Sequence, residues 1–485
     1  MNLPIAIFSS ILAIGSSAHP LEPAHGKRHV VANLRRSSFA RRQGPAVKLQ
    51  NGTQPVFDAA TVHTEVQGLL TKYSMASDFL NGINLNPDTA QPDTDYYGPF
   101  NDTPIIQYFA NSSKPSSLLK TPALRTRTGP AEGAEPILGL PNEPYASFEL
   151  MPLKDDVAGG MDVAYYGALK FGTPGQELTV SVDTGSADLW VPVACPGCSH
   201  DQFDAGASST YHNTGRRVSV TYGAGRVAGT VAADTVALGA LSVDAQRFVA
   251  VRTESQDFMD YASSGLLGLA FRAISRMDAP TFFEGLLAGR KLAAGIFSTH
   301  LARGSADGNA DGSQICFGCY DLTKTTGPVE WHNLTSKTYW TVGMDGVAVG
   351  KNRTAPLNLT AAIDTGSSLI LVSDDVAQQF YSMIPGSQDA SASYGSGFWT
   401  YPCSSSVTNS LVFSGRPYMI HKDDMNLGKL SDDSDDCVGG IIGVSSEYGL
   451  PANLAIIGDV FLKSWYVTFD YAGSRLGLAP SVNNR

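Results

Sequence analysis

The chain has 485 residues, of which 43% are hydrophobic and 16% are charged. This is enough apolar material for a large packed core and more sequence than one compact domain usually holds, so two or more globular units are expected. The net charge is −11, and the acidic excess falls after residue 154. Such a balance disfavours nucleic acid and anionic membranes as partners.

The N-terminus has the features of a secretory signal peptide. Residues 3–14 are apolar, and Ser16, Ser17 and Ala18 follow as small residues suited to cleavage. This run is too short to cross a bilayer, and no later stretch supplies about 20 uninterrupted apolar residues, so no membrane span is expected. We predict a signal peptide over 1–18 and an extracellular product, with a vacuolar location as the alternative. Six glycosylation sequons fit the same route: Asn51, Asn101, Asn111, Asn333, Asn352 and Asn358.

Residues 19–154 differ in composition from the rest of the chain. Dibasic pairs are followed by a Pro/Ser/Thr/Asn-rich stretch with little periodicity, which is typical of a removable pro-region. The alternative is a flexible extension that is never removed. Lys154 belongs to no dibasic pair, so we favour autocatalytic cleavage at low pH and expect the mature chain to begin between Tyr145 and Met161. The dibasic pairs are Lys27-Arg28, Arg35-Arg36 and Arg41-Arg42.

Short β-branched and aromatic runs dominate the sequence after residue 160. Gly, Asp and Asn turns separate them, which indicates a predominantly β architecture. Two helices are expected within it, one over 281–288 and one over 374–383. The second has Ser373 as a plausible N-cap and Pro385 beyond its end.

The same four residues close an apolar strand twice. Asp-Thr-Gly-Ser follows the run 178–182 at 183–186, and it follows the run 361–363 at 364–367. One copy alone would be a solvated aspartate in a turn. Two copies in matching contexts, about a domain length apart, indicate an internal duplication whose halves face each other across a cleft.

Each half would contribute one carboxylate to a shared site. Two carboxyls within hydrogen-bond reach cannot both ionise cheaply, so they share a proton. We predict that the ionised member of Asp183 and Asp364 takes a proton from a water that attacks a peptide carbonyl. The protonated member hydrogen-bonds the carbonyl oxygen and later helps to protonate the amine. This chemistry needs no metal, cofactor or covalent intermediate.

The residues next to each aspartate have supporting roles in this prediction. The glycines permit a sharp backbone turn, the threonines exchange hydrogen bonds across the pair, and the serines bond the outer carboxylate oxygens. They are Thr184, Gly185, Ser186, Thr365, Gly366 and Ser367.

A glycine-rich turn joins two alternating runs farther along the chain. The runs 218–221 and 227–231 flank Tyr222-Gly223-Ala224-Gly225. This pattern predicts a hairpin whose tip can close over a substrate, with Tyr222 pressing on it. The alternative is a core tyrosine at a strand end.

From about Tyr165 to Pro480 the chain resembles the pepsin family of aspartic proteases, particularly its secreted fungal members. The resemblance implies an all-β, bilobal fold: two pseudo-symmetric, β-barrel-like lobes, with a substrate cleft between them and a few short helices. The expected lobes are 155–330, with Asp183 and the hairpin, and 331–485, with Asp364. The motifs that carry it are YYGALKFGTPGQ, VDTGSADLWVP, VTYGAGRVAGTVAADTV, SGLLGLAF, AIDTGSSLILV and AIIGDVFLKSWYVTFD.

The resemblance also implies an activity. We expect a secreted, monomeric aspartic endopeptidase, synthesised as a zymogen, that cleaves proteins and peptides at acid pH. Ala224 stands where members that accept lysine before the scissile bond often carry an acidic residue, so large hydrophobic side chains are expected there instead. The residues expected to contact substrate are Tyr222, Gly223, Ala224, Trp190, Phe258, Leu266 and Leu267. The alternatives are a pepsin-like binder without hydrolysis and a metal-stabilised structural protein.

Six cysteines in an exported chain are expected to pair, although their spacing alone does not fix the connectivity. The two C-x-x-C pairs lie too far apart for usual zinc-finger spacings, so no metal site is expected. The resemblance implies two of the pairings and leaves the last two cysteines to each other. The three pairs are Cys195–Cys198, Cys403–Cys437 and Cys316–Cys319.

Overall fold

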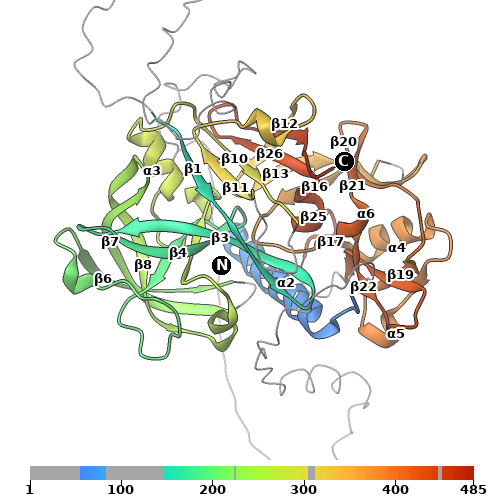
Figure 1. Ribbon diagram of the computed structural model, residues 1–485, viewed down its shortest axis with the longest axis horizontal. Coiled ribbons are helices and arrows are strands. Elements are labelled where there is room, and N and C mark those ends of the chain that lie inside the picture. Colours follow the sequence, from blue (N-terminus) through green and yellow to red (C-terminus); the bar gives the residue numbers. More distant parts are fainter. Residues whose placement is uncertain are drawn as a thin grey trace, which may run out of the picture. The chain divides into compact units, whose positions relative to one another are not determined.

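The computed structural model describes residues 55–82, 147–222, 225–303, 312–354, 356–445 and 450–484 (Figure 1). All of them belong to one compact unit of the chain, 45–485. The predicted signal peptide, the dibasic pairs and the sequons Asn51, Asn101 and Asn111 lie outside these residues. No helix in the described ranges is both long enough and apolar enough to span a bilayer.

The first half of the described β structure is an eight-stranded sheet with the order β2-β3-β4-β9-β5-β8-β7-β6. Strands β6 and β7 form the hairpin that the sequence predicts around Tyr222, and β4 ends at Asp183. The strands are β2 (Lys154–Ala158), β3 (Met161–Phe171), β4 (Gln176–Asp183), β5 (Leu189–Pro192), β6 (His212–Thr221), β7 (Arg226–Leu238), β8 (Leu241–Glu254) and β9 (Gly265–Gly268).

An eleven-stranded sheet has the order β1-β11-β10-β26-β27-β12-β13-β16-β25-β17-β24. Strand β1 occupies one edge, where it pairs with β11 in an antiparallel manner. The strands are β1 (Glu149–Pro152), β10 (Ile296–His300), β11 (Gln314–Phe317), β12 (Glu330–Lys337), β13 (Trp340–Met344), β16 (Leu359–Ile363), β17 (Ile370–Ser373), β24 (Ile441–Val444), β25 (Leu454–Ile457), β26 (Trp465–Asp470) and β27 (Arg475–Pro480).

Two four-stranded sheets complete the β structure of the described ranges. One contains β14 (Gly346–Val349), β15 (Asn352–Arg353), β20 (Asn409–Phe413) and β21 (Arg416–Ile420). The other contains β18 (Gln388–Asp389), β19 (Trp399–Pro402), β22 (Asn426–Lys429) and β23 (Asp436–Gly439).

Both predicted helices are present. Helix α3 (Phe282–Ala288) begins with a capping box, in which the Thr281 side chain accepts from the Glu284 backbone N–H and the Glu284 side chain accepts in return. Helix α4 (Asp374–Ser382) has Ser373 at its N-cap position, but that side chain makes no cap hydrogen bond. The other helices are α2 (Ala59–Gly82), α5 (Ser391–Tyr394), α6 (Lys422–Met425) and α7 (Asp459–Leu462), with short 3-10 turns η2 (Ala205–Ala207), η3 (Gln256–Asp260), η4 (Arg272–Ile274) and η5 (Leu322–Lys324).

The two strands that precede the Asp-Thr-Gly-Ser sequences have equivalent neighbours. Strand β4 runs parallel to β9, β9 antiparallel to β5, and β5 parallel to β8. Strand β16 likewise runs parallel to β25, β25 antiparallel to β17, and β17 parallel to β24. This repeated arrangement supports the predicted duplication, and the prediction of an all-β fold with a few short helices is confirmed.

Helix α2 is the element that the sequence analysis did not predict. Asp58 caps it by accepting hydrogen bonds from the backbone N–H groups of Ala60 at 3.0 Å and Thr61 at 3.2 Å. Apolar residues then recur at helical spacing and are buried in the main hydrophobic core. They are Val62, Val66, Leu69, Leu70 and Tyr73. The helix therefore packs against the sheets through one continuous apolar face.

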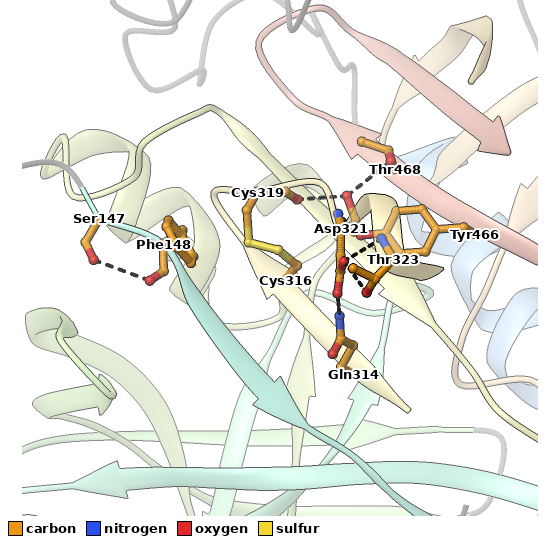
Figure 2. Close-up of a disulfide and its surroundings, with 10 residues drawn as sticks. Ser147, Phe148, Gln314, Cys316, Cys319, Asp321, Thr323, Tyr466 and Thr468 are labelled. Atoms are coloured by element: carbon orange, nitrogen blue, oxygen red, sulfur yellow. Dashed lines mark hydrogen bonds between the residues drawn. A yellow bond between two sulfur atoms is a disulfide. The ribbon is translucent and has the colours of Figure 1, made fainter. Parts of the chain in front are cut away.

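Three disulfides are formed, and they join the pairs named above. Figure 2 shows Cys316–Cys319, which is fully buried and packs against Phe148 and Leu150 at the β1 edge of the large sheet. The Ser298 hydroxyl donates a hydrogen bond of 3.0 Å to the Cys319 carbonyl oxygen. The disulfide thus fixes the turn after β11, beneath β1.

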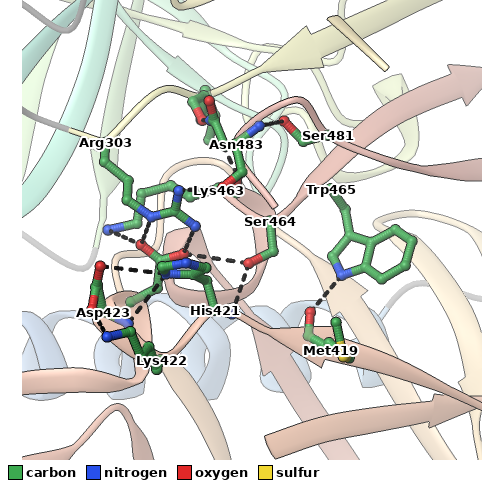
Figure 3. A network of polar contacts seen from close by, with 12 residues as sticks. Arg303, Met419, His421, Lys422, Asp423, Lys463, Ser464, Trp465, Ser481 and Asn483 are labelled. Atoms are coloured by element: carbon green, nitrogen blue, oxygen red, sulfur yellow. Dashed lines mark hydrogen bonds and ion pairs between the residues drawn. The ribbon is translucent and has the colours of Figure 1, made fainter. Parts of the chain in front are cut away.

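A buried charged cluster connects β3 to the C-terminal part of the chain. Lys463 Nζ lies 2.6 Å from Asp162 Oδ2 and 3.4 Å from Asp424 Oδ1. Arg303 donates two hydrogen bonds of 2.8 Å to the Asp424 carboxylate and lies beside Lys463 (Figure 3). Because each charge has an opposite partner, the cluster is stable away from water.

We expect Asp155→Asn to flatten the pH dependence of stability. Burial and, next, the Asp162 carboxylate raise the pKa of Asp155 from 3.8 to about 9. The stability that this carboxyl contributes is therefore complete below about pH 3.8 and is lost as the pH rises toward 9, at up to about 1.4 kcal/mol per pH unit. Urea denaturation at pH 4, 6 and 8 measures this slope. The exposed Asp244 provides the control Asp244→Asn, and equal slopes in both variants would contradict the expectation.

Candidate active site

The two repeated aspartates lie together. Asp183 follows from the end of β4 and Asp364 from the end of β16, and their exposed fractions are 2% and 0%. Each carboxyl group affects the pKa of the other, so the two lie within interaction distance. The duplication therefore brings one carboxyl from each half of the chain into a single buried pair.

Hydrogen bonds of the two threonines join the loop of Asp183 to the loop of Asp364. Thr184 Oγ1 donates a hydrogen bond of 2.9 Å to the Ile363 carbonyl, and Thr365 Oγ1 donates one of 2.9 Å to the Val182 carbonyl. Each hydroxyl also accepts from the backbone N–H of the other threonine, at 3.1 and 3.0 Å. These reciprocal bonds fix the relative position of the two carboxyls.

The glycines have a different role from the one expected. Neither Gly185 nor Gly366 adopts a positive φ, so the turn itself does not require glycine. A Cβ at Gly185 would lie 2.4 Å from Asp364 Oδ1, and a Cβ at Gly366 would lie 2.4 Å from Asp183 Oδ1. The absence of a side chain is what allows each carboxylate to approach the opposite loop.

The serines do not behave as a symmetric pair. Ser367 Oγ donates a hydrogen bond to Asp364 Oδ2. Ser186 Oγ is buried and has no hydrogen-bond partner among the described residues, so its predicted bond to Asp183 is absent in this structure. The two carboxyls therefore have unequal surroundings.

A lysine from α2 lies between the two carboxyls. Lys72 Nζ is 2.8 Å from Asp183 Oδ1 and 2.8 Å from Asp364 Oδ2. The hydroxyl of Tyr73 donates a hydrogen bond of 3.0 Å to Asp364 Oδ2. Helix α2 thus places a cationic group directly against both carboxyls.

Burial and charge act on these groups in opposite directions. Burial alone would lower the pKa of Lys72, but the two carboxylates raise it above its ordinary value. Burial and the neighbouring Asp364 raise the pKa of Asp183, against the effect of Lys72. At Asp364, burial is outweighed by Lys72 and by hydrogen bonds from Asp183 and Ser367, so its pKa is lowered. The two carboxyls are therefore unequal, with the pKa of Asp183 above that of Asp364.

Two further contacts hold α2 in place. Glu65 accepts a hydrogen bond of 3.0 Å from Ser368 Oγ, in the loop that follows Asp364. Before the helix, the Phe57 N–H donates a hydrogen bond of 2.7 Å to the Lys429 carbonyl. Both partners belong to the C-terminal half of the chain, so the segment is attached there at two points that precede Lys72.

A small apolar cavity of ≈ 60 Å³ adjoins Asp183 on the side of the first sheet. Three aromatic rings gather at its wall, with centroid separations of 6.3 Å for Trp190–Tyr222, 5.1 Å for Trp190–Phe258 and 5.8 Å for Tyr222–Phe258. Leu266 also lines it. Leu267, expected beside it, is fully buried instead, because successive side chains of a strand point to opposite faces. Gly223 and Ala224 lie outside the described residues.

The comparison with known proteins identifies the family. Residues 164–481 match the family model described as eukaryotic aspartyl protease. The chain belongs to this family of pepsin-like aspartic endopeptidases. This chain is 33% identical to major aspartyl peptidase 1 of Cryptococcus neoformans var. grubii over 343 residues, which cover 67% of this chain and 70% of that protein. It is 34% identical to pepsin A of Gallus gallus over 331 residues, covering 66% and 85%, and 32% identical to cathepsin E of Mus musculus over 329 residues, covering 66% and 81%.

The part of the aspartyl protease that matches the family begins after α2. Lys72 and Tyr73 are the site residues that sequence reasoning missed. The available signal was local: Asp58 at a helix start, followed by apolar residues at 62, 66, 69, 70 and 73. That signal predicts an amphipathic helix, but it does not indicate where the helix binds.

Proposed function

We propose that this aspartyl protease is secreted as a zymogen and that its processed form cleaves proteins at acid pH, with large hydrophobic residues preferred around the scissile bond. The observation that supports the proposal most directly is the contact of Lys72 with both Asp183 and Asp364. A single ammonium group can reach both carboxyls only if they form one site. While the ammonium group stays there, no peptide can reach the two carboxyls.

Catalysis follows from an unequal carboxyl pair once α2 has left. The ionised carboxylate takes a proton from a water as its oxygen attacks the peptide carbonyl, while the protonated carboxyl donates a hydrogen bond to the carbonyl oxygen. The tetrahedral intermediate then collapses, and the amine leaves with a proton supplied by the pair. The Gly185 and Gly366 N–H groups donate hydrogen bonds of 2.8 and 3.0 Å to the neighbouring aspartates and hold them in position.

Acid is the proposed trigger for activation. Because the pKa of Asp364 is lowered in the folded precursor, its ion pair with Lys72 contributes stability above the ordinary carboxyl pKa of 3.8. That contribution is lost as the pH falls through the lowered value. Protonation of Asp364 therefore weakens the hold on α2 and supports self-processing under acidic conditions.

Two observations support the remaining parts of the proposal. The aromatic wall beside Asp183 favours a large apolar side chain next to the scissile bond. The three disulfides, together with the apolar residues 3–14, favour an exported protein. The sequons Asn333, Asn352 and Asn358 are exposed and accessible to glycosylation.

The pairing of β1 favours the early part of the proposed window for the mature start. Strand β1 pairs with β11, and the Ser147 N–H donates a hydrogen bond of 2.8 Å to the Lys291 carbonyl. A cut at the beginning of the window between Tyr145 and Met161 leaves these bonds intact, whereas a cut at Lys154 separates β1 from the rest of the chain. We therefore propose a mature N-terminus between Tyr145 and Ser147.

Hydrolysis of denatured haemoglobin by the acid-processed protein, followed from pH 2 to 8, tests the proposal. We expect cleavage that rises toward acid pH, and N-terminal sequencing of the processed protein should find a start between Tyr145 and Ser147. Absence of cleavage by a processed and folded protein would favour a pepsin-like binding protein instead. A start immediately after Arg42 would contradict self-processing at the proposed position.

A further inference from the structure

A buried histidine and glutamate lie behind the aromatic wall of the cavity. Glu254 is the last residue of β8, and its side chain is only 1% exposed. Neither of its carboxylate oxygens has a hydrogen-bond partner among the described residues, and the same holds for His200 Nδ1. His200 Nδ1 lies 3.9 Å from Glu254 Oε1. The two groups therefore face each other without any other neutralising contact in the described part of the chain.

The loop that carries His200 is attached to the wall segment. His200 Nε2 lies 2.6 Å from the carbonyl oxygen of Tyr261, and Ser199 Oγ donates a hydrogen bond of 3.3 Å to the Met259 carbonyl. These two residues directly follow the Cys195–Cys198 disulfide, which restricts the loop. The loop thus holds the part of the chain that directly follows Phe258.

The hydrogen-bond chemistry of this arrangement requires a proton. A carbonyl oxygen only accepts, so Nε2 of His200 carries a hydrogen, and in a neutral imidazole Nδ1 is then a bare acceptor. A bare acceptor facing a carboxylate is unfavourable when both are buried. A proton on Glu254 removes the conflict. Burial raises the pKa of Glu254, against the effect of His200.

We propose that protonation of Glu254 beside His200 positions the Phe258 wall, so that the cavity binds a large apolar substrate side chain more tightly at acid pH than near neutrality. The inference deepens the proposed peptidase function and rests on it for the identity of the occupant. As the pH rises, Glu254 loses its proton, its carboxylate faces the bare Nδ1 acceptor and the wall loosens. Both are positioning residues, since neither reaches the reacting atoms.

The other charged groups around the pair are at the surface or have partners of their own. Arg226 on β7 and Arg252 on β8 are exposed, as is Asp201 on the loop of His200. Asp156 on β2 accepts a hydrogen bond of 3.0 Å from the Ala262 N–H. Solvent screens these exposed charges, so they act only weakly on Glu254.

Two substitutions of Glu254 separate its titration from simple packing. In Glu254→Gln the amide can donate to Nδ1 and does not titrate, so the contact survives at every pH. In Glu254→Leu the contact is absent at every pH. Glu177→Gln, at an exposed site on β4, is the matched control.

The assay compares two peptides that differ only in phenylalanine or alanine before the scissile bond, between pH 3.5 and 6.5. For the wild type and the control, the KM ratio of the phenylalanine to the alanine peptide should rise about five- to tenfold over this range, the ratio that one hydrogen bond supplies. In Glu254→Gln the KM ratio should stay low at every pH, and in Glu254→Leu it should stay high at every pH. In both variants kcat should change less than about twofold. A wild-type slope in Glu254→Gln would overturn the proposal.

A second readout does not depend on hydrolysis. The near-ultraviolet circular dichroism of the uncut precursor reports the packing of Trp190, Tyr222 and Phe258. We expect a titration between pH 4 and 8 in the wild type and none in Glu254→Gln. If this difference is present but no form cleaves peptides, the positioning pair is supported and the peptidase function is refuted. A wild-type signal that does not titrate would overturn the pair.

Discussion

Asp183→Asn and Asp364→Asn should each reduce the hydrolysis of denatured haemoglobin by about 100- to 10,000-fold, the range expected for the loss of a positioned acid or base. Asparagine has nearly the volume of aspartate, so the threonine bonds that join the two loops remain possible. It cannot carry the shared proton or a negative charge, however. Either substitution therefore leaves the pair unable to activate water.

The comparison requires variants that have been cut at the same place. If processing is autocatalytic, neither variant will mature by itself, so each precursor should be processed by a small amount of wild-type enzyme that is then removed. Asp244→Asn, at an exposed position on β8, should retain wild-type activity. If one of the two dyad variants kept more than about a tenth of the activity, that carboxyl would not be required and the shared-water mechanism would be wrong.

The sequence predicts those features of the site that depend on a short local sequence pattern. An apolar strand that ends in Asp-Thr-Gly-Ser appears twice, and strands place such residues reproducibly at one edge of a sheet. The equivalent neighbours of β4 and β16 follow from this repetition. Part of the aromatic wall was also within reach, because Trp190 and Tyr222 occur in motifs that resemble those of the pepsin family.

The features that the sequence does not predict depend on contacts between distant residues. Lys72 is 111 residues from Asp183 and 292 from Asp364, and nothing in its neighbourhood indicates either partner. The reason for Gly185 and Gly366 is similar, since each glycine makes room for a carboxylate of the opposite loop rather than for its own turn. His200 and Glu254 are two ordinary polar residues until the fold buries them face to face.

Lys72→Met should convert the precursor into a protein that cleaves peptides without prior acid activation. Methionine keeps the length and the apolar stem of lysine but removes the ammonium group. Breaking a buried ion pair typically costs about 3–5 kcal/mol, which corresponds to at least about a 100-fold shift toward release of α2. We therefore expect the uncut variant to hydrolyse a fluorogenic peptide at pH 5.5, where the wild-type precursor stays inactive.

Initial rates must be taken before gel electrophoresis detects any cut chain, because processed enzyme would give the same signal. Lys170→Met, at an exposed position on β3, should behave as the wild type. Tyr73→Phe removes only the hydrogen bond to Asp364 and should shift the equilibrium far less, by about threefold to tenfold. A larger effect of Lys72→Met than of Tyr73→Phe distinguishes inhibition by the Lys72 ion pairs from steric blockage by α2. If the uncut Lys72→Met precursor were as inactive as the wild-type precursor, the buried apolar face of α2 would be sufficient for inhibition. Acid would then have to act on some other contact.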